Sequence, residues 1–385
     1  MPSVTAKVDA IVSKFKEVAE NHHKYAEEWK ARTGKKVVGY LCTYTPEEVL
    51  YAAGILPVRI TGSHQPQDIT EAHIYNMFCP YCRDCLAEGL QGNYRYLDGI
   101  VHAFSCIHIR QTYDSWLRHV PTPFSHFLYV PNHLQAPSAR NKVADEVKQF
   151  KSAVESWLGT PITNQSLQKA VATYNTNRRL MSQIYELRKQ DNPPISGEEA
   201  MYMVMASLCM DKAEHNRLLR QLLAALPLRD RTKHGQLRVM YLSSESDAVN
   251  LIRLIETLGA EVVTDDNCIG TRYFMQEVDL KPRSDVLTAI ANRYVDKPPC
   301  PVKDMVERNR LPHVKKLVQD YKINAAVYAK MKFCDPHEYD IPSIKKMLDE
   351  MGIPLLVLEC DITIPEGQFR TRIEAFLEVL QLETV

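Results

Sequence analysis

The sequence predicts an α/β fold with two Rossmann-like or flavodoxin-like halves, each built on a parallel sheet, and a helical segment between them. Two observations lead to this prediction. A strand–helix–strand pattern that begins near Lys35 recurs after residue 229, and the residues between the two copies have helical periodicity. A strand–helix–strand unit is the building block of a parallel sheet. We therefore expect an N-terminal helical segment (1–34), a first α/β domain (35–138), a helical connecting region (139–228) and a second α/β domain (229–385).

The first half begins with two short apolar runs that flank a helical pattern. "KKVVGYLC" (35–42) predicts a buried strand, "TPEEVLYAAG" (45–54) a helix closed by its final glycine, and "ILPVRITG" (55–62) a second strand. Thr45 and Glu48 have the spacing of a capping box, with Pro46 at the favoured first helical position. The apolar run 100–104 predicts a third strand, and "FSHFLYVPNH" (124–133) a strand with its exit loop.

The second half repeats this plan after long helical patterns at 141–159, 164–190 and 196–226. "QLRVMYLSS" (236–244) predicts a strand, "ESDAVNLIRLIETLG" (245–259) a helix and "AEVVTDD" (260–266) a strand. Ser244 and Asp247 repeat the capping spacing of the first half. A further strand runs into "FCDPHEYD" (333–340), where Asp335 is the expected N-cap of the next helix.

Composition disfavours several classes of partner. The chain has 47 basic and 47 acidic side chains, so no charge excess points to nucleic acid or an anionic membrane. No apolar run is long enough to span a bilayer, and the N-terminus lacks the pattern of a signal peptide. We expect a cytoplasmic protein that binds neither nucleic acid nor membrane, with its ten cysteines reduced and a metal or catalytic role for any cluster of them.

The stretch "MFCPYCRDC" (77–85) holds three of these cysteines, but helix geometry separates them. Pro80 favours the first helical position, which places Cys79 at the N-cap, where the helix dipole is expected to lower the pKa of its thiol. Cys82 and Cys85 then point progressively away from Cys79 around the helix axis. Isolated cysteines such as Cys42, Cys209, Cys268, Cys300 and Cys360 are expected to be buried apolar side chains.

Two distant cysteines share the placement of Cys79 before a helix. Cys106 follows the strand at 100–104, and Cys334 follows a strand and precedes "DP". Open α/β sheets bind ligands at the carboxyl ends of their strands, so Cys79, Cys106 and Cys334 can converge on one crevice between the halves. Three thiolates would leave one iron of a tetranuclear cluster without a cysteine, although a buried structural role fits each cysteine equally well.

Several motifs together resemble the 2-hydroxyacyl-CoA dehydratase and benzoyl-CoA reductase family. They are "GYLCTYTPEEVLYAAGILPVRITG", "CPYCRDCLAEGL", "YLDGIVHAFSC", "VVTDDNCIGTRYF", "FCDPHEYD" and "EGQFRTRIEAFLE". The resemblance implies a [4Fe-4S] cluster held by three cysteines, which fall on Cys79, Cys106 and Cys334. Family members usually lack thiols at Cys82 and Cys85, so Cys82 is kept only as a reserve ligand. Ile107 departs from the family, which often has an acidic residue there.

The sequences of these motifs are most similar to those of one subunit of an ATP-dependent benzoyl-CoA reductase. That subunit is the smaller of the pair that forms the active site. That resemblance implies reduction of the aromatic ring of benzoyl-CoA to a cyclic diene through a ketyl radical. It also implies a paralogous cluster-binding subunit, ATP-hydrolysing iron–sulfur electron-donor subunits, an upstream ferredoxin and an aromatic acyl-CoA substrate. ATP and magnesium belong to the partners, because this chain has no P-loop motif.

Other residues near predicted strand ends are candidates for substrate binding or proton transfer. Arg59 and Arg272 could bind a CoA phosphate or form ion pairs, and Tyr44 could face the crevice. Proton transfer could involve His102, His108 or Glu359, although surface placement also fits each histidine.

Three other functions compete with the reductase. Within the family, the alternative is an (R)-2-hydroxyacyl-CoA dehydratase subunit, in which the electron is recycled. A non-enzymatic protein with a structural zinc site at Cys79, Cys82 and Cys85 is a second rival. A thiol oxidoreductase using Cys79 and Cys82 is a third, weakened because such a motif normally follows the first strand of its fold.

Overall fold

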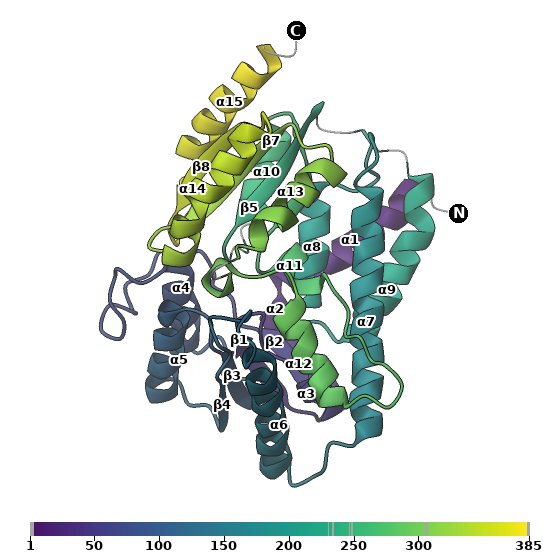
Figure 1. Ribbon diagram of the computed structural model, residues 1–385, viewed down its shortest axis with the longest axis vertical. Coiled ribbons are helices and arrows are strands. Elements are labelled where there is room, and N and C mark those ends of the chain that lie inside the picture. The colour runs from purple at the N-terminus through teal and green to yellow at the C-terminus, as the bar shows by residue number, and fades with distance from the viewer. Residues whose placement is uncertain are drawn as a thin grey trace.

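The computed structural model describes residues 4–229, 231–232, 235–245, 247, 249–304 and 307–382, and these form two four-stranded parallel sheets (Figure 1). The first sheet has the order β2-β1-β3-β4 and the second the order β6-β5-β7-β8. The strands are β1 (Val37–Leu41), β2 (Leu56–Arg59), β3 (Gly99–Ala103), β4 (Phe124–Leu128), β5 (Leu237–Ser243), β6 (Ala260–Asp266), β7 (Ala325–Met331) and β8 (Leu355–Cys360). Counted from its own first strand, each sheet has the same order, which confirms the predicted pair of α/β halves.

Equivalent helices connect the first two strands of each sheet. In the first half this helix is α3 (Glu47–Ala52), and in the second it is α10 (Val249–Thr257). A glycine with positive φ follows each helix, with φ 77° at Gly54 and φ 95° at Gly259. Side chains other than glycine rarely adopt this conformation, so the two glycines let the chain turn from the helix into the next strand.

The predicted capping box of α3 is wrong. Pro46 is the N-cap and makes no side-chain cap bond, and the hydroxyl of Thr45 is buried with no hydrogen-bond partner among the described residues. Glu48 cannot reach back to the cap because Arg178 donates to it at 2.5 Å and the Tyr294 hydroxyl donates to it at 2.9 Å. The Ser244 hydroxyl is likewise buried without a partner in the described chain, and Asp247 pairs with His64 instead of capping.

The remaining crossovers contain most of the loops that form the candidate site. The first half contains α4 (Pro80–Leu90) before β3 and α5 (Ile107–His119) before β4. Between β6 and β7 lie α11 (Thr271–Phe274), α12 (Val286–Asp296), the short 3-10 helix η2 (Pro301–Lys303) and α13 (Arg310–Asp320). The chain ends with α14 (Asp335–Glu350) before β8, and α15 (Glu366–Leu382) after it.

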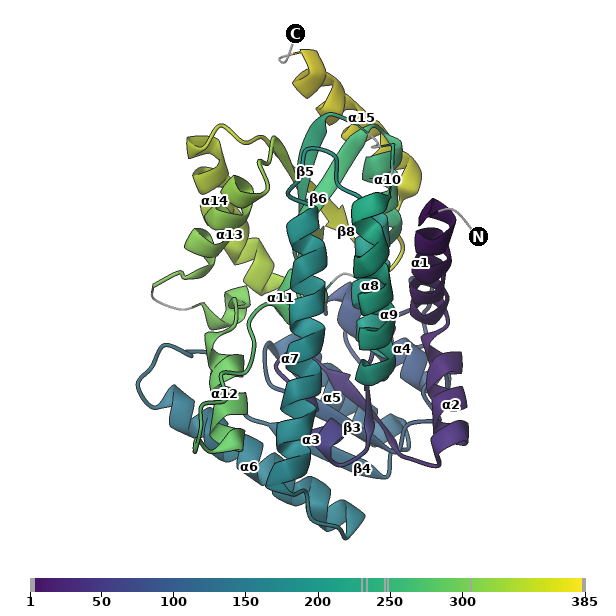
Figure 2. The same cartoon turned by 90° about the vertical axis from the view of Figure 1, so that its right-hand side faces the viewer.

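The helical region ties the two halves together, as Figure 2 shows for α7. It comprises α6 (Ala139–Leu158), α7 (Asn164–Leu187), α8 (Gly197–Ser207), α9 (Lys212–Ala225) and the 3-10 helix η1 (Leu226–Leu228). Helix α7 packs on α3 of the first half and on α11 of the second, and α8 packs on α10 and β6. The N-terminal helices α1 (Val4–Glu20) and α2 (His22–Thr33) cover this region, with α1 against α8 and α9. The exact domain boundaries remain a prediction.

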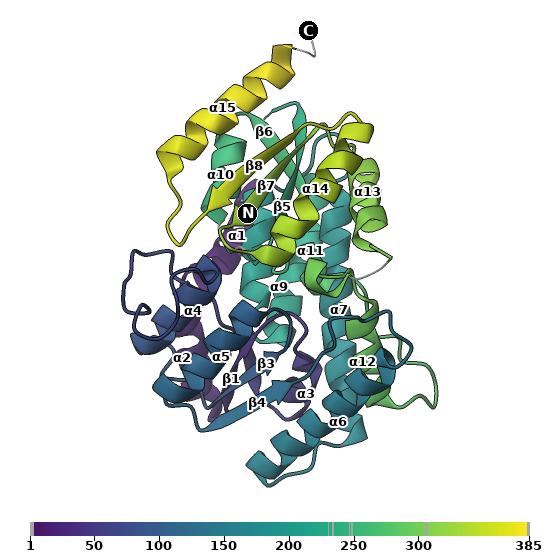
Figure 3. The ribbon, with the colours of Figure 1, turned by 60° about the vertical axis from the view of Figure 1, so that its left-hand side comes forward.

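The two sheets lie one above the other, with the loops after their central strands between them (Figure 3). In each sheet the order of the parallel strands changes direction between the first and third strands, which are β1 and β3 in one half and β5 and β7 in the other. A crevice forms at such a switch point because the two connecting loops leave in opposite directions. None of the described helices has the length and apolar character needed to cross a membrane.

Candidate metal centre

A cavity of about 340 Å³ lies where the switch points of the two sheets face each other. Its wall includes Cys42 to Tyr44 after β1, Phe104 to Ile109 after β3, and Ser244 and Glu245 after β5. The start of α14, from Cys334 to His337, completes the set of loops at the strand ends. Both halves therefore contribute to one site, as expected for ligand binding at the carboxyl ends of parallel strands.

Sulfur is concentrated in this cavity. Seven of the ten cysteines line it, namely Cys42, Cys79, Cys82, Cys106, Cys268, Cys300 and Cys334. The others are buried elsewhere, and the Cys85 thiol donates to the carbonyl of Ile60 at 3.7 Å. The structure leaves Cys85 out of the cavity, as helix geometry predicts, but it brings Cys82 into hydrogen-bond contact with Cys79, which that geometry did not predict. A self-contained zinc site of those three thiols is not formed.

Cys79, Cys106 and Cys334 share one position, the N-cap of a helix that leads away from the cavity. They cap α4, α5 and α14 respectively, whereas Asp335, expected as the cap of α14, is its first helical residue. The first amides of each helix point toward its cap and carry a partial positive charge, which favours an anion there. Three helix dipoles therefore converge on these three sulfur atoms.

The pKa of the Cys79 thiol is raised, contrary to the lowering expected at a helix N-cap. A hydrogen bond with Cys334 lowers the pKa of the Cys79 thiol, but a hydrogen bond with Cys82 and burial raise it more, so it lies well above its ordinary value. The hydrogen bond with Cys79, followed by burial, raises the pKa of Cys334, and burial raises that of Cys106. Neighbouring thiolates in an apolar cavity repel each other, so a bound cation is needed to stabilise them.

His108 connects two of these helix starts. Its Nδ1 atom accepts a hydrogen bond from the backbone N–H of Cys79 at 3.1 Å, and its Nε2 atom lies 3.9 Å from a carboxylate oxygen of Asp335. With Nδ1 as acceptor, the ring proton is on Nε2, facing Asp335. His108 lines the cavity, and burial lowers its pKa. It therefore holds the Cys79 loop in place and presents a neutral ring at the cavity.

Tyr44 also lines the cavity and lies among buried cations. Its hydroxyl accepts the backbone N–H of Cys300 at 3.3 Å. The ammonium groups of Lys297 and Lys303 lie 4.2 and 5.1 Å from the centre of its ring. Burial lowers the pKa of Lys297 to about 7 and that of Lys303 to about 8. Neither lysine lines the cavity, and their lowered pKa values mean that burial disfavours the charged forms.

The two predicted arginines lie behind the cavity wall in ion pairs. Arg59 is buried, donates to Glu245 at 2.5 Å and lies 5.5 Å from the centre of the Tyr40 ring. Arg272 lies 3.2 Å from Asp266 and donates to the carbonyl of Ser243 at 2.7 Å. Neither arginine lines the cavity, so both positions match the ion-pair alternative.

His102 and Glu359 lie away from the cavity. His102 is fully buried on β3 between the rings of Tyr113 and Phe127, and burial lowers its pKa to about 3. Glu359 is exposed on β8 and pairs with Lys330 at 2.8 Å. Of the three candidates for proton transfer, the structure places only His108 at the cavity.

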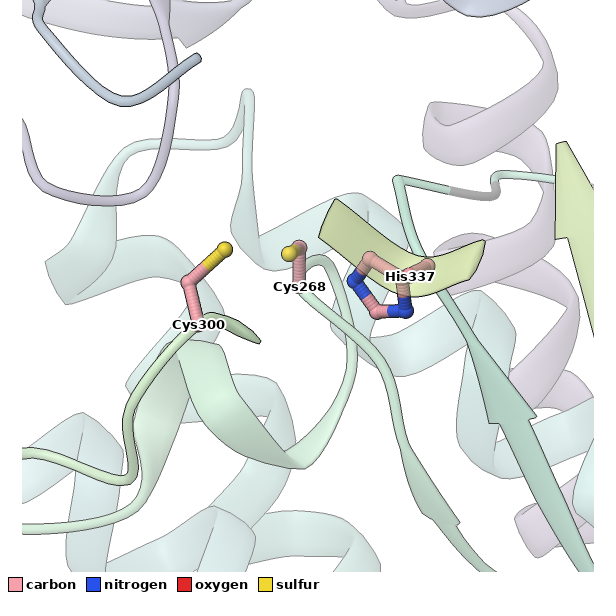
Figure 4. Close-up of side chains that lie close together, drawn as sticks. All are labelled: Cys268, Cys300 and His337. Carbon is pink, nitrogen blue, oxygen red and sulfur yellow. The ribbon is translucent and has the colours of Figure 1, made fainter. Parts of the chain in front are cut away.

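A second group of ligand atoms in the same cavity was missed. The sulfur atoms of Cys268 and Cys300 and a ring nitrogen of His337 lie within 4.8 Å of one another, close enough to hold a metal ion. Figure 4 shows Cys268 between the other two side chains, with the Cys300 sulfur directed toward it. The sequence contains a signal for both cysteines, because Cys268 is separated by one residue from the strand segment 260–266 and Cys300 precedes a proline, as Cys79 does.

Comparison with known proteins identifies relatives along nearly the whole chain. The family model described as 2-hydroxyglutaryl-CoA dehydratase, D-component, matches residues 42–380. The (R)-phenyllactyl-CoA dehydratase beta subunit of Clostridium sporogenes is 26% identical, covering 97% of this chain and 99% of that protein. The beta subunit of lactoyl-CoA dehydratase from Anaerotignum propionicum is 27% identical, covering 97% and 100%. A benzoyl-CoA reductase subunit of Thauera aromatica is 25% identical, covering 86% and 87%.

Proposed function

Because this chain belongs to the 2-hydroxyglutaryl-CoA dehydratase D-component family, matched over residues 42–380, we propose that it is an iron–sulfur subunit of a complex that acts on a CoA thioester. The relatives are subunits of two dehydratases and one reductase, and the name of each includes a CoA thioester. The observation that carries the proposal is the gathering of thiols from both halves at one cavity between the two switch points.

Cys79, Cys106 and Cys334 are the proposed ligands of a [4Fe-4S] cluster. Their chemistry fits this group, because thiolates are the usual ligands of iron–sulfur clusters and three helix N-termini favour negative charge at these sulfurs. The loops come from separate crossovers, so the sulfur atoms can surround a group wider than a single ion. Cys82, buried beside Cys79, stays as the reserve ligand.

When bound, the cluster would supply single electrons at low potential to the thioester. The protein's own contribution is the cavity wall, where Tyr44, Tyr81 and Phe104 offer aromatic surface to an acyl group. This wall excludes water from a reactive radical. His108 is a candidate to hold or deliver a proton at Nε2, because it lines the same cavity.

The finer proposal is the smaller active-site subunit of an ATP-dependent benzoyl-CoA reductase. Three aromatic rings in the cavity wall suit a flat aromatic acyl group, and the Thauera aromatica benzoyl-CoA reductase protein is among the relatives. A second candidate is an (R)-2-hydroxyacyl-CoA dehydratase subunit. The fuller coverage of the dehydratase beta subunits, 97% of this chain against 86% for the reductase protein, favours it.

Partner subunits are part of either proposal. A paralogous cluster-binding subunit would complete the active site, and ATP-hydrolysing iron–sulfur subunits, supplied by a ferredoxin, would deliver the electrons. The chain has no P-loop motif for ATP, which supports the assignment of ATP hydrolysis to the partner subunits.

Electron stoichiometry tests the proposal and separates its two forms. The complex is purified anaerobically with its partner subunits and supplied with ATP, a low-potential reductant and either benzoyl-CoA or (R)-phenyllactyl-CoA. A reductase consumes reductant in proportion to the diene formed, whereas a dehydratase needs only a catalytic amount to convert many substrate molecules. A colourless protein that contains no iron and accepts neither substrate would overturn both forms.

A further inference from the structure

We propose that Cys268 and Cys300 from the β6–β7 crossover and His337 from the β7–β8 crossover bind one mononuclear divalent ion of the Zn²⁺ or Fe²⁺ class, separate from the cluster at Cys79, Cys106 and Cys334. Two thiolates and one imidazole form a donor set that such borderline ions prefer. Three protein ligands leave the fourth position of a tetrahedron open. Because all three residues line the cavity, that position faces the space proposed for substrate.

The spacing of the three ligand atoms fits a tetrahedral ion. Bonds of about 2.3 Å to sulfur and about 2.0 Å to nitrogen place these ligand atoms roughly 3.5 to 3.8 Å apart around a tetrahedral centre. In the structure the two sulfur atoms and the ring nitrogen are all within 4.8 Å of one another. Small side-chain rotations would therefore be enough to close the site around an ion.

His337 has one ring nitrogen that is hydrogen-bonded and one that, among the described residues, is left available to a metal ion. It is 2% exposed, and its Nδ1 atom lies 2.6 Å from the Tyr328 hydroxyl. Its Nε2 atom is buried without a hydrogen-bond partner among the described residues, which is costly for a polar atom. Metal-bound histidines typically fix the second ring nitrogen through a hydrogen bond of this kind. An ion at Nε2 would satisfy the atom that is otherwise left unpaired.

The two thiols are held in place by their loops. The backbone N–H of Cys268 donates to the carbonyl of Ser244 at 3.2 Å, and that of Cys300 donates to the Tyr44 hydroxyl at 3.3 Å. Gly270 shapes the Cys268 loop, because a Cβ atom there would lie 2.0 Å from a carboxylate oxygen of Asp265. Hydrogen bonds to the loops after β5 and β1, the first strand of each half, thus fix the backbone that carries each thiol.

Charge balance also favours a divalent cation. As thiolates, the buried Cys268 and the half-buried Cys300 carry two negative charges, which a divalent ion neutralises. Arg272 and Lys297 lie close enough to Cys268 to interact with its charge, but each is already engaged, Arg272 with Asp266 and Lys297 with the backbone and hydroxyl of Thr43. The second thiolate therefore lacks a full counter-charge without an ion.

Cobalt binding tests this site independently of the proposed function. The full-length chain is freed of metal with a chelator under reducing, anaerobic conditions and titrated with Co²⁺ alone. We expect the triple variant Cys79→Ser/Cys106→Ser/Cys334→Ser to retain one tightly bound Co²⁺ with the intense ligand-field bands of a tetrahedral ion and thiolate-to-cobalt charge transfer. Adding Cys268→Ser/Cys300→Ser to this triple variant should abolish both signals. Cys85→Ala, which removes a buried thiol outside the cavity, is the matched control.

A more conservative variant tests the site in case the serine substitutions prevent folding. Tyr328→Phe deletes only the hydroxyl beside His337, and its affinity for Co²⁺ should fall by about 10- to 100-fold with charge transfer retained at saturation. Unchanged cobalt binding after Cys268→Ser/Cys300→Ser is added to the triple variant would overturn the proposal. Loss of cobalt binding in the triple variant itself would also overturn it, because all the thiols would then hold one larger cluster. Absence of an iron–sulfur cluster would contradict the proposed function and leave the cobalt result unaffected.

Discussion

The Nε2 atom of His64 lies 2.6 Å from the Oδ1 atom of Asp247, and this contact joins the loop after β2 to the loop after β5. The charge of Asp247 raises the pKa of His64 from 6.5 to about 10. Burial would raise the pKa of Asp247, but the charge and hydrogen bond of His64 bring it below its ordinary value. Asp84 also faces His64 and accepts its backbone N–H at 2.8 Å. An ion pair therefore links the two halves at neutral pH.

This pair predicts that stability falls as the solution becomes alkaline. Because the pKa of His64 is raised by folding, its contribution is complete below its unfolded value of 6.5 and disappears as pH rises through about 10. We expect His64→Gln to lower the free energy of unfolding by about 2 kcal/mol near pH 6 and by close to zero above pH 10. Urea denaturation across this range measures the difference. A deficit independent of pH would contradict the prediction, since the variant keeps Asp84 and every other titrating group.

Asp266 lies between two buried guanidinium groups. Its carboxylate is 3.2 Å from Arg272 and 2.6 Å from Arg310. Replacing it by asparagine leaves both cations without this counter-charge, so Asp266→Asn should lower the free energy of unfolding by about 3 to 5 kcal/mol. The exposed pair of Lys322 and Asp191 gives the control, because Asp191→Asn should cost less than about 1 kcal/mol. Similar losses in the two variants, measured by denaturant unfolding, would show that the buried network is not stabilising.

The fold could be predicted from local patterns. Parallel strands between helices have continuous apolar runs, and turn glycines such as Gly54 and Gly259 mark where each helix ends. The repetition of this pattern indicated two halves. The failure at Thr45 has a tertiary cause, since the carboxylate of Glu48 is bound by Arg178, which lies 130 positions away in sequence. No local pattern shows such a partner.

Local sequence context predicts only part of the candidate site. Strand ends and prolines point to Cys79, Cys106 and Cys334, and the structure places all three at one cavity. Cys268 and Cys300 have similar neighbours, but their proximity depends on the long crossover between β6 and β7, whose path sequence periodicity does not define. The ion-pair partner of Arg59 is also not predictable from local sequence, because that partner, Glu245, belongs to the other half.

Two hydroxyl groups with similar sequence contexts are predicted to differ in their contribution to stability. Ser196 caps α8, accepting the N–H of Glu199 at 3.1 Å while the Glu199 carboxylate accepts the N–H of Ser196 at 2.9 Å. Ser196→Ala should therefore lower the free energy of unfolding by about 1 kcal/mol. Thr45 has the same spacing to Glu48 but no bond, so Thr45→Val should be neutral or stabilising by up to about 1 kcal/mol. Equal losses in thermal unfolding would show that Thr45 is hydrogen-bonded after all.

The proposed cluster ligands can be tested one at a time through iron content. Each of Cys79→Ser, Cys106→Ser and Cys334→Ser, purified and reconstituted without oxygen, should lose most of its iron, its acid-labile sulfide and its brown colour, because serine oxygen is a poor ligand for a cluster iron. Cys85→Ala is the control, since its thiol bonds to Ile60 outside the cavity and its loss should leave the iron content unchanged. Full iron content in Cys334→Ser together with loss in Cys82→Ser would instead make the reserve ligand the true one, and the cluster would then lie entirely on the first half of the chain.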